Sequence, residues 1–204
     1  KKNRIQYFPV VNWKKEFMLM NKNKINKLEW TVNFEKIKLN PLFNKNHLDK
    51  IIAVKKKFNV KIPSVTCDFF MENPVFKNNN EFTLDILRKI IENGKKIGVK
   101  YYILPLVDKS SIKNVKEEKV IINKMQYFSR YLNKDQKILF EIDYEPKKVK
   151  KFILNFDKKF GINYDSGNSA SNGFKINEEK IYFDRVHNIH IKDRFYNGKT
   201  VALG

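Results

Sequence analysis

Residues 99–107 read Val-Lys-Tyr-Tyr-Ile-Leu-Pro-Leu-Val, and this stretch decides the fold. Apart from Lys100, every residue in it is apolar or aromatic, so polar and apolar side chains do not alternate. A strand of this kind is buried on both faces, which is typical of a parallel sheet covered by helices. Pro105 lies inside the run and weakens the prediction of a strand, unless it occupies a bulge or a strand end.

Similar runs recur along the chain, and longer amphipathic stretches separate them. The other predicted strands, one of which is interrupted by Pro63, are residues 27–33, 60–69, 137–143, 161–165 and 186–192. Apolar residues at helical spacing predict helices over residues 13–20, 47–58, 83–97, 116–132, 146–160 and 177–183. Thr83 is expected to cap its helix, Gly94 or Gly98 to end it, and Pro146 to lie in a first turn.

Helices and strands therefore alternate in the order expected of βα units. The glycine-rich first turn of a doubly wound nucleotide-binding sheet is missing, so a (β/α)₈ TIM barrel fits better. Only six of its eight strands are visible, and we expect strands 2–7 to be present and strands 1 and 8 to be missing. The chain does not begin with Met and stops at Val201-Ala-Leu-Gly204. We therefore expect residues 1–204 to be a fragment of one barrel domain.

The composition of the chain limits the classes of partner that it is expected to bind. The chain has 204 residues and a net charge of +20, which first suggests nucleic acid or an anionic membrane. However, 37 of its 42 basic residues are scattered lysines, whereas phosphate-reading surfaces favour arginine. No apolar run approaches the roughly 20 residues that cross a bilayer. The single cysteine, Cys67, excludes an internal disulfide, so we expect a cytoplasmic protein with neither a nucleic-acid nor a membrane partner.

Three consecutive predicted strands end on groups that bind divalent metal. They are Glu141 in Lys137-Ile-Leu-Phe-Glu-Ile-Asp143, Asp165 in Ile162-Asn-Tyr-Asp-Ser-Gly-Asn168, and His190 in Val186-His-Asn-Ile-His190. Functional side chains of a barrel lie at the C-terminal strand ends, so these three are expected to converge. Taken singly, Glu141 could merely pair with a lysine, and Asp165 could close its strand with an ordinary turn.

His190 has a neighbour, His187, three residues before it. On a regular strand the two side chains face opposite sides of the sheet, so only one is expected to point into the barrel. His190 is nearer the polar Lys192-Asp-Arg194, and we assign it to the site and His187 to structure. One imidazole and two carboxylates make a mostly oxygen site that suits Mn²⁺, Mg²⁺, Co²⁺ or Zn²⁺.

These residues resemble the sugar phosphate isomerase/epimerase family, whose members share the xylose isomerase-like TIM barrel. The resemblance covers essentially the whole chain. It is carried by Asp165-Ser-Gly-Asn-Ser-Ala-Ser171, Asp184-Arg185, His190-Ile-Lys-Asp-Arg194, Gly198-Lys-Thr-Val-Ala-Leu-Gly204, Arg4-Ile-Gln-Tyr-Phe-Pro9, Leu28-Glu-Trp30, Asn40-Pro-Leu42 and Pro63-Ser-Val-Thr-Cys-Asp-Phe-Phe-Met71.

The resemblance implies an enzyme of carbohydrate metabolism that isomerises or epimerises a sugar or sugar phosphate. The implied metal ligands are Glu141, Asp165 and His190, with a fourth ligand, a glutamate, beyond Gly204. Glu141 is also implied as one group of the acid/base pair that moves a proton beside a carbonyl through an enediolate. Asn168 stands where relatives often place a substrate-contacting histidine.

Further side chains could bind the sugar. Glu29 and Asp68 could accept hydrogen bonds from hydroxyls, or could be salt-bridged rim residues. Lys192 and Arg194 flank the loop after the last predicted strand, where barrels often bind phosphate. Large aromatic side chains could stack on a sugar, although we expect core packing for them; they are Trp13, Trp30, Phe69 and Phe70.

Two other functions stay open. The same superfamily contains endonuclease IV-like AP endonucleases, which the positive charge favours, but their zinc sites need more histidines than the three in this chain. A non-catalytic barrel that binds a sugar or a protein is the other alternative. The sequence identifies neither the particular sugar nor the oligomeric state, and it is compatible with a homo-oligomer.

Overall fold

A computed structural model of the chain describes residues 7–43, 45–77 and 81–203, without the side chains of residues 45 and 46. Among the motifs quoted above, Arg4-Ile-Gln6 and Gly204 lie outside the described residues. In the described part, no helix has both the length and the apolar character needed to cross a membrane.

The six predicted strands are confirmed, and they form one sheet. The strands are β1 (Lys27–Thr31), β2 (Lys61–Thr66), β3 (Tyr101–Leu106), β4 (Lys137–Ile142), β5 (Phe160–Asp165) and β6 (Val186–His190). Their order in the sheet follows the order in the chain, and every neighbouring pair is parallel. Parallel order with a crossover after each strand is the arrangement of a TIM barrel.

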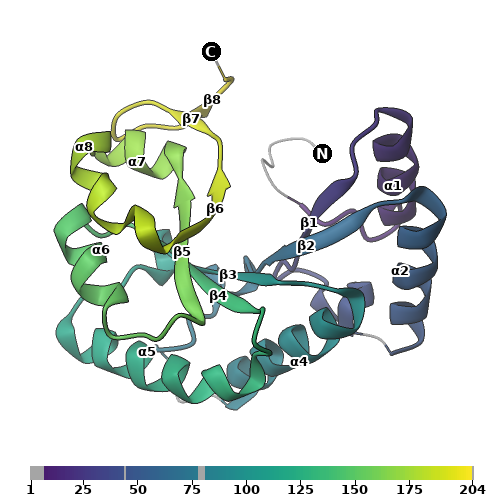
Figure 1. Cartoon of the computed structure of the whole chain (residues 1–204), viewed down its shortest axis with the longest axis horizontal. Helices are drawn as coiled ribbons and strands as arrows, with labels where there is room; N and C mark the ends of the chain where they lie inside the picture. Colours follow the sequence, from purple (N-terminus) through teal and green to yellow (C-terminus); the bar gives the residue numbers. More distant parts are fainter. Residues whose placement is uncertain (1–6, 44, 78–80, 204) are drawn as a thin grey trace.

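Helices cover the outer side of this curled sheet (Figure 1). The long ones are α1 (Trp13–Lys22), α2 (Lys45–Phe58), α4 (Glu81–Ile97), α5 (Val115–Phe128) and α6 (Pro146–Ile153). Shorter elements are α3 (Phe69–Glu72), α7 (Ser166–Asn172), α8 (Ile176–Glu179) and the antiparallel strands β7 (Asp193–Arg194) and β8 (Thr200–Val201). Single 3₁₀ turns occupy Ile37–Leu39, Pro41–Phe43, Asp108–Ser110 and Ser129–Tyr131, and a longer one Lys180–Arg185. The described residues thus supply the six-stranded portion of a barrel that corresponds to strands 2–7.

Both prolines inside strands lie at irregular or partly unpaired positions of the sheet. Pro63 lies where the register between β1 and β2 shifts, because Lys27 faces Lys61 whereas Glu29 faces Ser64. Pro105 lies beyond Ile103, the last β3 residue that pairs with β2. Each proline therefore lies at an irregularity or beyond the paired part of one of its ladders, where strands tolerate proline, and Pro105 stays in register with Glu141 of β4.

The main core lies between the helices and the outer face of the sheet. The four aromatic side chains considered for sugar stacking are buried there: Trp13, Trp30, Phe69 and Phe70. Core packing, the expected alternative, is therefore confirmed for them.

Several helix boundaries differ from the sequence predictions. Thr83 is not a cap, because α4 begins at Glu81 and Thr83 is buried inside it. Gly98 does end α4, with a left-handed φ of 84° that favours glycine. Pro146 lies in the first turn of α6, as expected, but this helix ends at Ile153 instead of reaching residue 160.

Candidate metal centre

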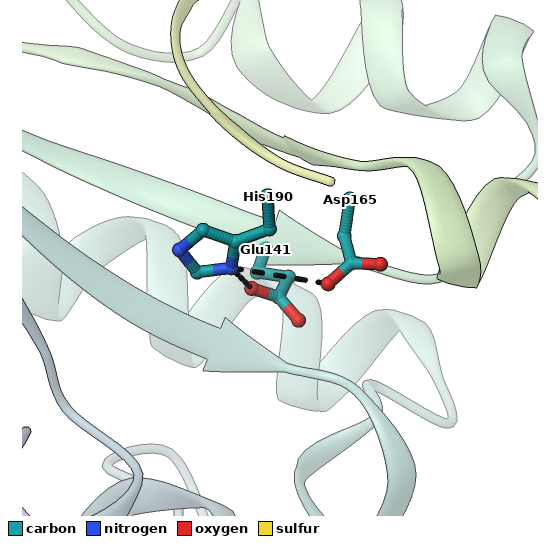
Figure 2. Close-up of side chains that lie close together, drawn as sticks. All are labelled: Glu141, Asp165 and His190. Carbon is teal, nitrogen blue, oxygen red and sulfur yellow. Dashed lines mark hydrogen bonds and ion pairs between the residues drawn. The ribbon is translucent and has the colours of Figure 1, made fainter. Parts of the chain in front are cut away.

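Glu141, Asp165 and His190 converge, as the sequence predicts. Each offers one ligand atom, and these atoms lie within 4.8 Å of one another (Figure 2). His190 Nδ1 is 3.1 Å from Glu141 Oε2 and 3.8 Å from Asp165 Oδ2. The three side chains come from neighbouring parallel strands, and Asp165 and His190 are direct partners in the register of β5 and β6.

Helix α7, which the sequence did not reveal, holds Asp165. The segment Asp165-Ser-Gly-Asn168 was a candidate for an ordinary turn that closes a strand. In the structure, α7 begins at Ser166, and Asp165 is its N-cap, with Oδ1 accepting a hydrogen bond of 2.9 Å from the Asn168 N–H. The cap fixes one carboxylate oxygen and leaves Oδ2 turned toward Glu141 and His190.

His187 departs from its predicted orientation. The ladder between β5 and β6 shifts register, because Val186 faces Ile162 whereas Asn188 faces Asn163. His187 is the extra residue and reaches the inner face as well, where its ring stacks on Tyr101 with centroids 6.4 Å apart. The prediction that only one of the two histidines points inward is therefore wrong, and the physical reason is a β-bulge. The assignment of His190 alone to the cluster holds.

The side chain of Asp165 is 1% exposed, so its carboxylate is almost fully withdrawn from solvent. Lys192 Nζ, 2.7 Å from Asp165 Oδ2, forms an ion pair with this oxygen. A buried carboxylate oxygen needs positive charge beside it, from an ammonium such as that of Lys192 or from a metal cation. Together with one imidazole and a second carboxylate, it forms a donor set that fits a divalent cation.

Strong electrostatic coupling accompanies this convergence. Burial disfavours a charged imidazole, but hydrogen bonds to Glu141 and Glu29 and the charges of these carboxylates outweigh burial and raise the pKa of His190 to about 10. For Lys192, burial is likewise outweighed, by the carboxylates of Glu141 and Asp165, so its pKa lies above the ordinary value.

A cleft of about 790 Å³, open to solvent, lies next to the cluster. Glu141 and His190 line it with further residues, among which are the predicted substrate-binding residues Asp68, Asn168, Lys192 and Arg194. The carboxyl of Asp68 accepts a hydrogen bond of 3.0 Å from the Thr66 hydroxyl. Burial and the charges of Glu141 and Glu29 raise its pKa to about 6, although the Thr66 hydrogen bond and Lys192 act in the opposite direction.

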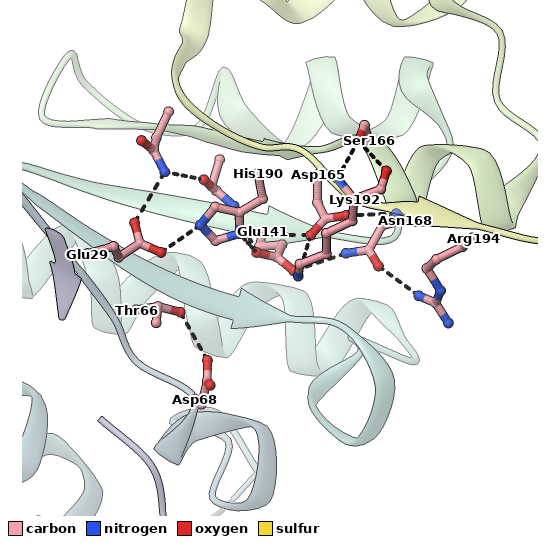
Figure 3. Close-up of polar contacts among 12 residues, drawn as sticks. Glu29, Thr66, Asp68, Glu141, Asp165, Ser166, Asn168, His190, Lys192 and Arg194 are labelled. Carbon is pink, nitrogen blue, oxygen red and sulfur yellow. Dashed lines mark hydrogen bonds and ion pairs between the residues drawn. The ribbon is translucent and has the colours of Figure 1, made fainter. Parts of the chain in front are cut away.

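Asn168 and Arg194 extend the hydrogen bonds of Glu141 away from the cluster (Figure 3). The Asn168 amide donates a hydrogen bond of 3.0 Å to Glu141 Oε1, and its carbonyl accepts one of 2.9 Å from the Arg194 guanidinium. The predicted site residues therefore lie together at one end of the sheet. Their roles in binding a sugar stay predictions.

Glu29 contacts the cluster directly. It lies inside β1, and its carboxylate is 2.7 Å from His190 Nε2. Glu29 is thus tied to the cluster itself, rather than to the rim.

Two asparagines of the cluster were missed. Asn163 donates a hydrogen bond of 2.8 Å to Glu141 Oε2, and Asn188 donates one of 2.8 Å to the Asn163 carbonyl. Each lies two residues before a predicted ligand, Asp165 or His190, on the same strand. The two-residue period of a strand places such residues on one face, so alternation is the signal that could have found them.

Comparison with known proteins supports the fold. No protein-family model and no curated protein matches the sequence. Solved structures do match: a xylose isomerase domain protein from Planctomyces limnophilus is 14% identical, with a TM-score of 0.72, and the match covers 92% of this chain and 75% of that one. The IolI protein with a bound zinc atom is 18% identical, with a TM-score of 0.69 and coverage of 89% and 68%.

A third match is 3-keto-D-glucoside 4-epimerase from E. coli, 12% identical, with a TM-score of 0.69 and coverage of 94% and 77%. The chain therefore has the xylose isomerase-like TIM-barrel fold, as its sequence motifs implied. Structures of this fold include two sugar epimerases and also a protein described as a probable 3-DHS dehydratase, and some contain zinc or magnesium.

Proposed function

We propose that the protein is a metal-dependent isomerase or epimerase of a sugar or sugar phosphate, and that residues 1–204 belong to one domain. The observation that carries the proposal is the convergence of Glu141, Asp165 and His190 beside an open cleft. The epimerase from E. coli, which has the same fold, supports the class of reaction, and the zinc in the IolI protein supports the cofactor.

The three ligands would be Glu141, Asp165 and His190. A bound Mn²⁺, Mg²⁺, Co²⁺ or Zn²⁺ would supply positive charge for oxygens on which negative charge develops. Two of the ligand side chains are held before any cation binds, because Asn163 and Asn168 bond the two oxygens of Glu141 and the Asn168 N–H bonds Asp165. Such preorganisation lowers the cost of binding.

Glu141 is the group proposed to move the proton. It is buried at the end of β4 and lines the cleft, so a sugar carbon next to a carbonyl can come within its reach. Removal of a proton from that carbon gives an enediolate. Delivery of a proton to the opposite face of the same carbon by the second group of the acid/base pair would be epimerisation, and return of the proton from Glu141 to the neighbouring carbon would be aldose–ketose isomerisation.

The remaining cleft residues are proposed to bind the substrate. Asp68 can accept hydrogen bonds from sugar hydroxyls when it is ionised, and Asn168 can donate and accept. Lys192 and Arg194 supply positive charge on the side of α7, where a phosphate or an acidic hydroxyl would be held.

Exchange of substrate protons with solvent tests this proposal directly. The protein is incubated with a panel of ketoses and ketose phosphates in heavy water with Mn²⁺, and deuterium next to the carbonyl is followed by NMR. We expect incorporation with at least one sugar. The Glu141→Gln variant should exchange roughly 10²–10⁴-fold more slowly, because a positioned general base contributes about that much.

The matched control is Glu145→Gln, which removes a carboxylate from an exposed position four residues further on. This variant should exchange at the parental rate. Absence of exchange with the whole panel, or equal rates for Glu141→Gln and Glu145→Gln, would contradict the proposal. Cleavage of abasic DNA that is lost in Glu141→Gln would point instead to the nuclease alternative.

A further inference from the structure

The two ring nitrogens of His190 face different partners. Nδ1 points to the proposed metal ligands, 3.1 Å from Glu141 Oε2 and 3.8 Å from Asp165 Oδ2. Nε2 lies 2.7 Å from Glu29 Oε1, on the other side of the ring (Figure 3). Only one nitrogen of a neutral imidazole carries a proton, so the partner of one nitrogen determines what the other can do.

Glu29 is itself held in place. The Asn188 amide contacts its second oxygen, Oε2, at 3.4 Å and also donates to Asn163, which in turn donates to Glu141. Glu29, His190, Glu141, Asn163 and Asn188 thus close a ring of polar contacts on the inner face of the sheet. The side chains of His190 and Glu29 are only 13% and 25% exposed, so water competes weakly for these contacts.

We propose that Glu29 is a positioning residue for the metal ligand His190. When a divalent cation takes the place of the Nδ1 proton, the carboxylate would keep the Nε2 proton and leave the Nδ1 lone pair for the metal. A carboxylate behind a ligating histidine fixes its tautomer and orientation and makes it a better ligand. The inference rests on the proposed metal site and adds to it a residue from β1, a strand at the opposite edge of the sheet.

The place of Glu29 in the chain makes the contact specific to the folded barrel. Residues 29 and 190 are 161 positions apart, on the first and last strands of the six-stranded sheet. The carboxylate reaches His190 only because the sheet curls far enough to bring its edges together. Metal affinity should therefore depend on β1, although β1 supplies no proposed ligand.

Calorimetric titration of the metal-free protein with Zn²⁺ measures this dependence. Glu29→Ala should weaken Zn²⁺ binding about 10–100-fold, the usual effect of removing such a partner. Glu29→Gln keeps the shape and an acceptor oxygen, so it should lose affinity to a smaller extent. The matched control is Asp68→Asn, which removes a carboxylate near the cluster that bonds to Thr66 and not to His190, so it should change affinity less than Glu29→Gln does.

A second readout separates positioning from a general loss of charge. ¹H–¹⁵N NMR of the imidazole rings should show the His190 Nε2–H tautomer in the Zn²⁺-loaded parent and in Asp68→Asn. In Glu29→Ala this tautomer should be less populated or its proton should exchange faster with water. If Glu29→Ala does not fold, the isosteric Glu29→Gln carries both measurements.

The outcomes are distinct. Failure of the parent to bind Zn²⁺ would overturn the proposed metal site and the inference with it. Binding by the parent, with both Glu29 variants within twofold of it and the His190 tautomer unchanged, would overturn the inference alone. An equal loss in Asp68→Asn would also overturn it, because charge and not position would then explain the effect.

Discussion

At the scale of single residues, Asp68 has the clearest pH-dependent consequence. Its folded-state pKa of about 6 exceeds the unfolded value of about 4, so the folded protein holds this proton more tightly than the unfolded chain does. The contribution to stability is complete below about pH 4 and is lost as pH rises through about 6. With allowance for partial exposure, the loss amounts to about 2 kcal/mol.

Urea unfolding between pH 4 and pH 7.5, without metal, checks this prediction. The free energy of unfolding of Asp68→Asn, relative to the parent, should rise by about 2 kcal/mol across this interval, because asparagine has no proton to lose. Asn can still accept the hydrogen bond from Thr66, so the comparison isolates the ionisation. A difference that stays constant with pH would show that Asp68 has no raised pKa.

The sequence predicts the residues of the cluster better than their contacts. Glu141, Asp165 and His190 could be found because each follows an apolar run at a strand end. The contact of Glu29 with His190 could not, since it depends on how far the sheet curls. The inward orientation of the His187 side chain could not be predicted either, because a bulge breaks the two-residue alternation on which the prediction of its orientation rests.

At the scale of elements, α7 joins the cluster to the segment that follows β6. It escaped prediction because Ser-Gly-Asn-Ser-Ala-Ser-Asn is poor in helix-forming residues. Its packing requires glycine at position 167: a Cβ there would lie 2.9 Å from Lys192 Cβ and 3.1 Å from Arg194 Cγ. The longer helices and the strands were predictable because tertiary packing reinforces their periodic apolar faces.

Gly167→Ala should therefore push Lys192 and Arg194 away from α7. We expect a loss of about 1–3 kcal/mol in the free energy of unfolding, the usual cost of overpacking, measured by chemical denaturation. Ala170→Ser, at an exposed position of the same helix, should stay within about 0.5 kcal/mol of the parent. If Gly167→Ala is as stable as the parent, position 167 does not lie as close to Lys192 and Arg194 as these distances indicate.

At the scale of the whole molecule, the fold gathers residues from both edges of the sheet. Strands β4, β5 and β6 supply the proposed ligands, β1 supplies Glu29, and the end of β2 supplies Asp68. The order of strands was predictable from the alternation of helices and strands along the chain. The degree of curl was not, because no local pattern encodes it.

Anomalous X-ray diffraction from crystals equilibrated with Zn²⁺ tests the central claim, that these strand ends form a metal centre. We expect a zinc peak about 2.0–2.2 Å from His190 Nδ1, Asp165 Oδ2 and an oxygen of Glu141. A peak elsewhere on the protein, or no peak at saturating Zn²⁺, would contradict that claim.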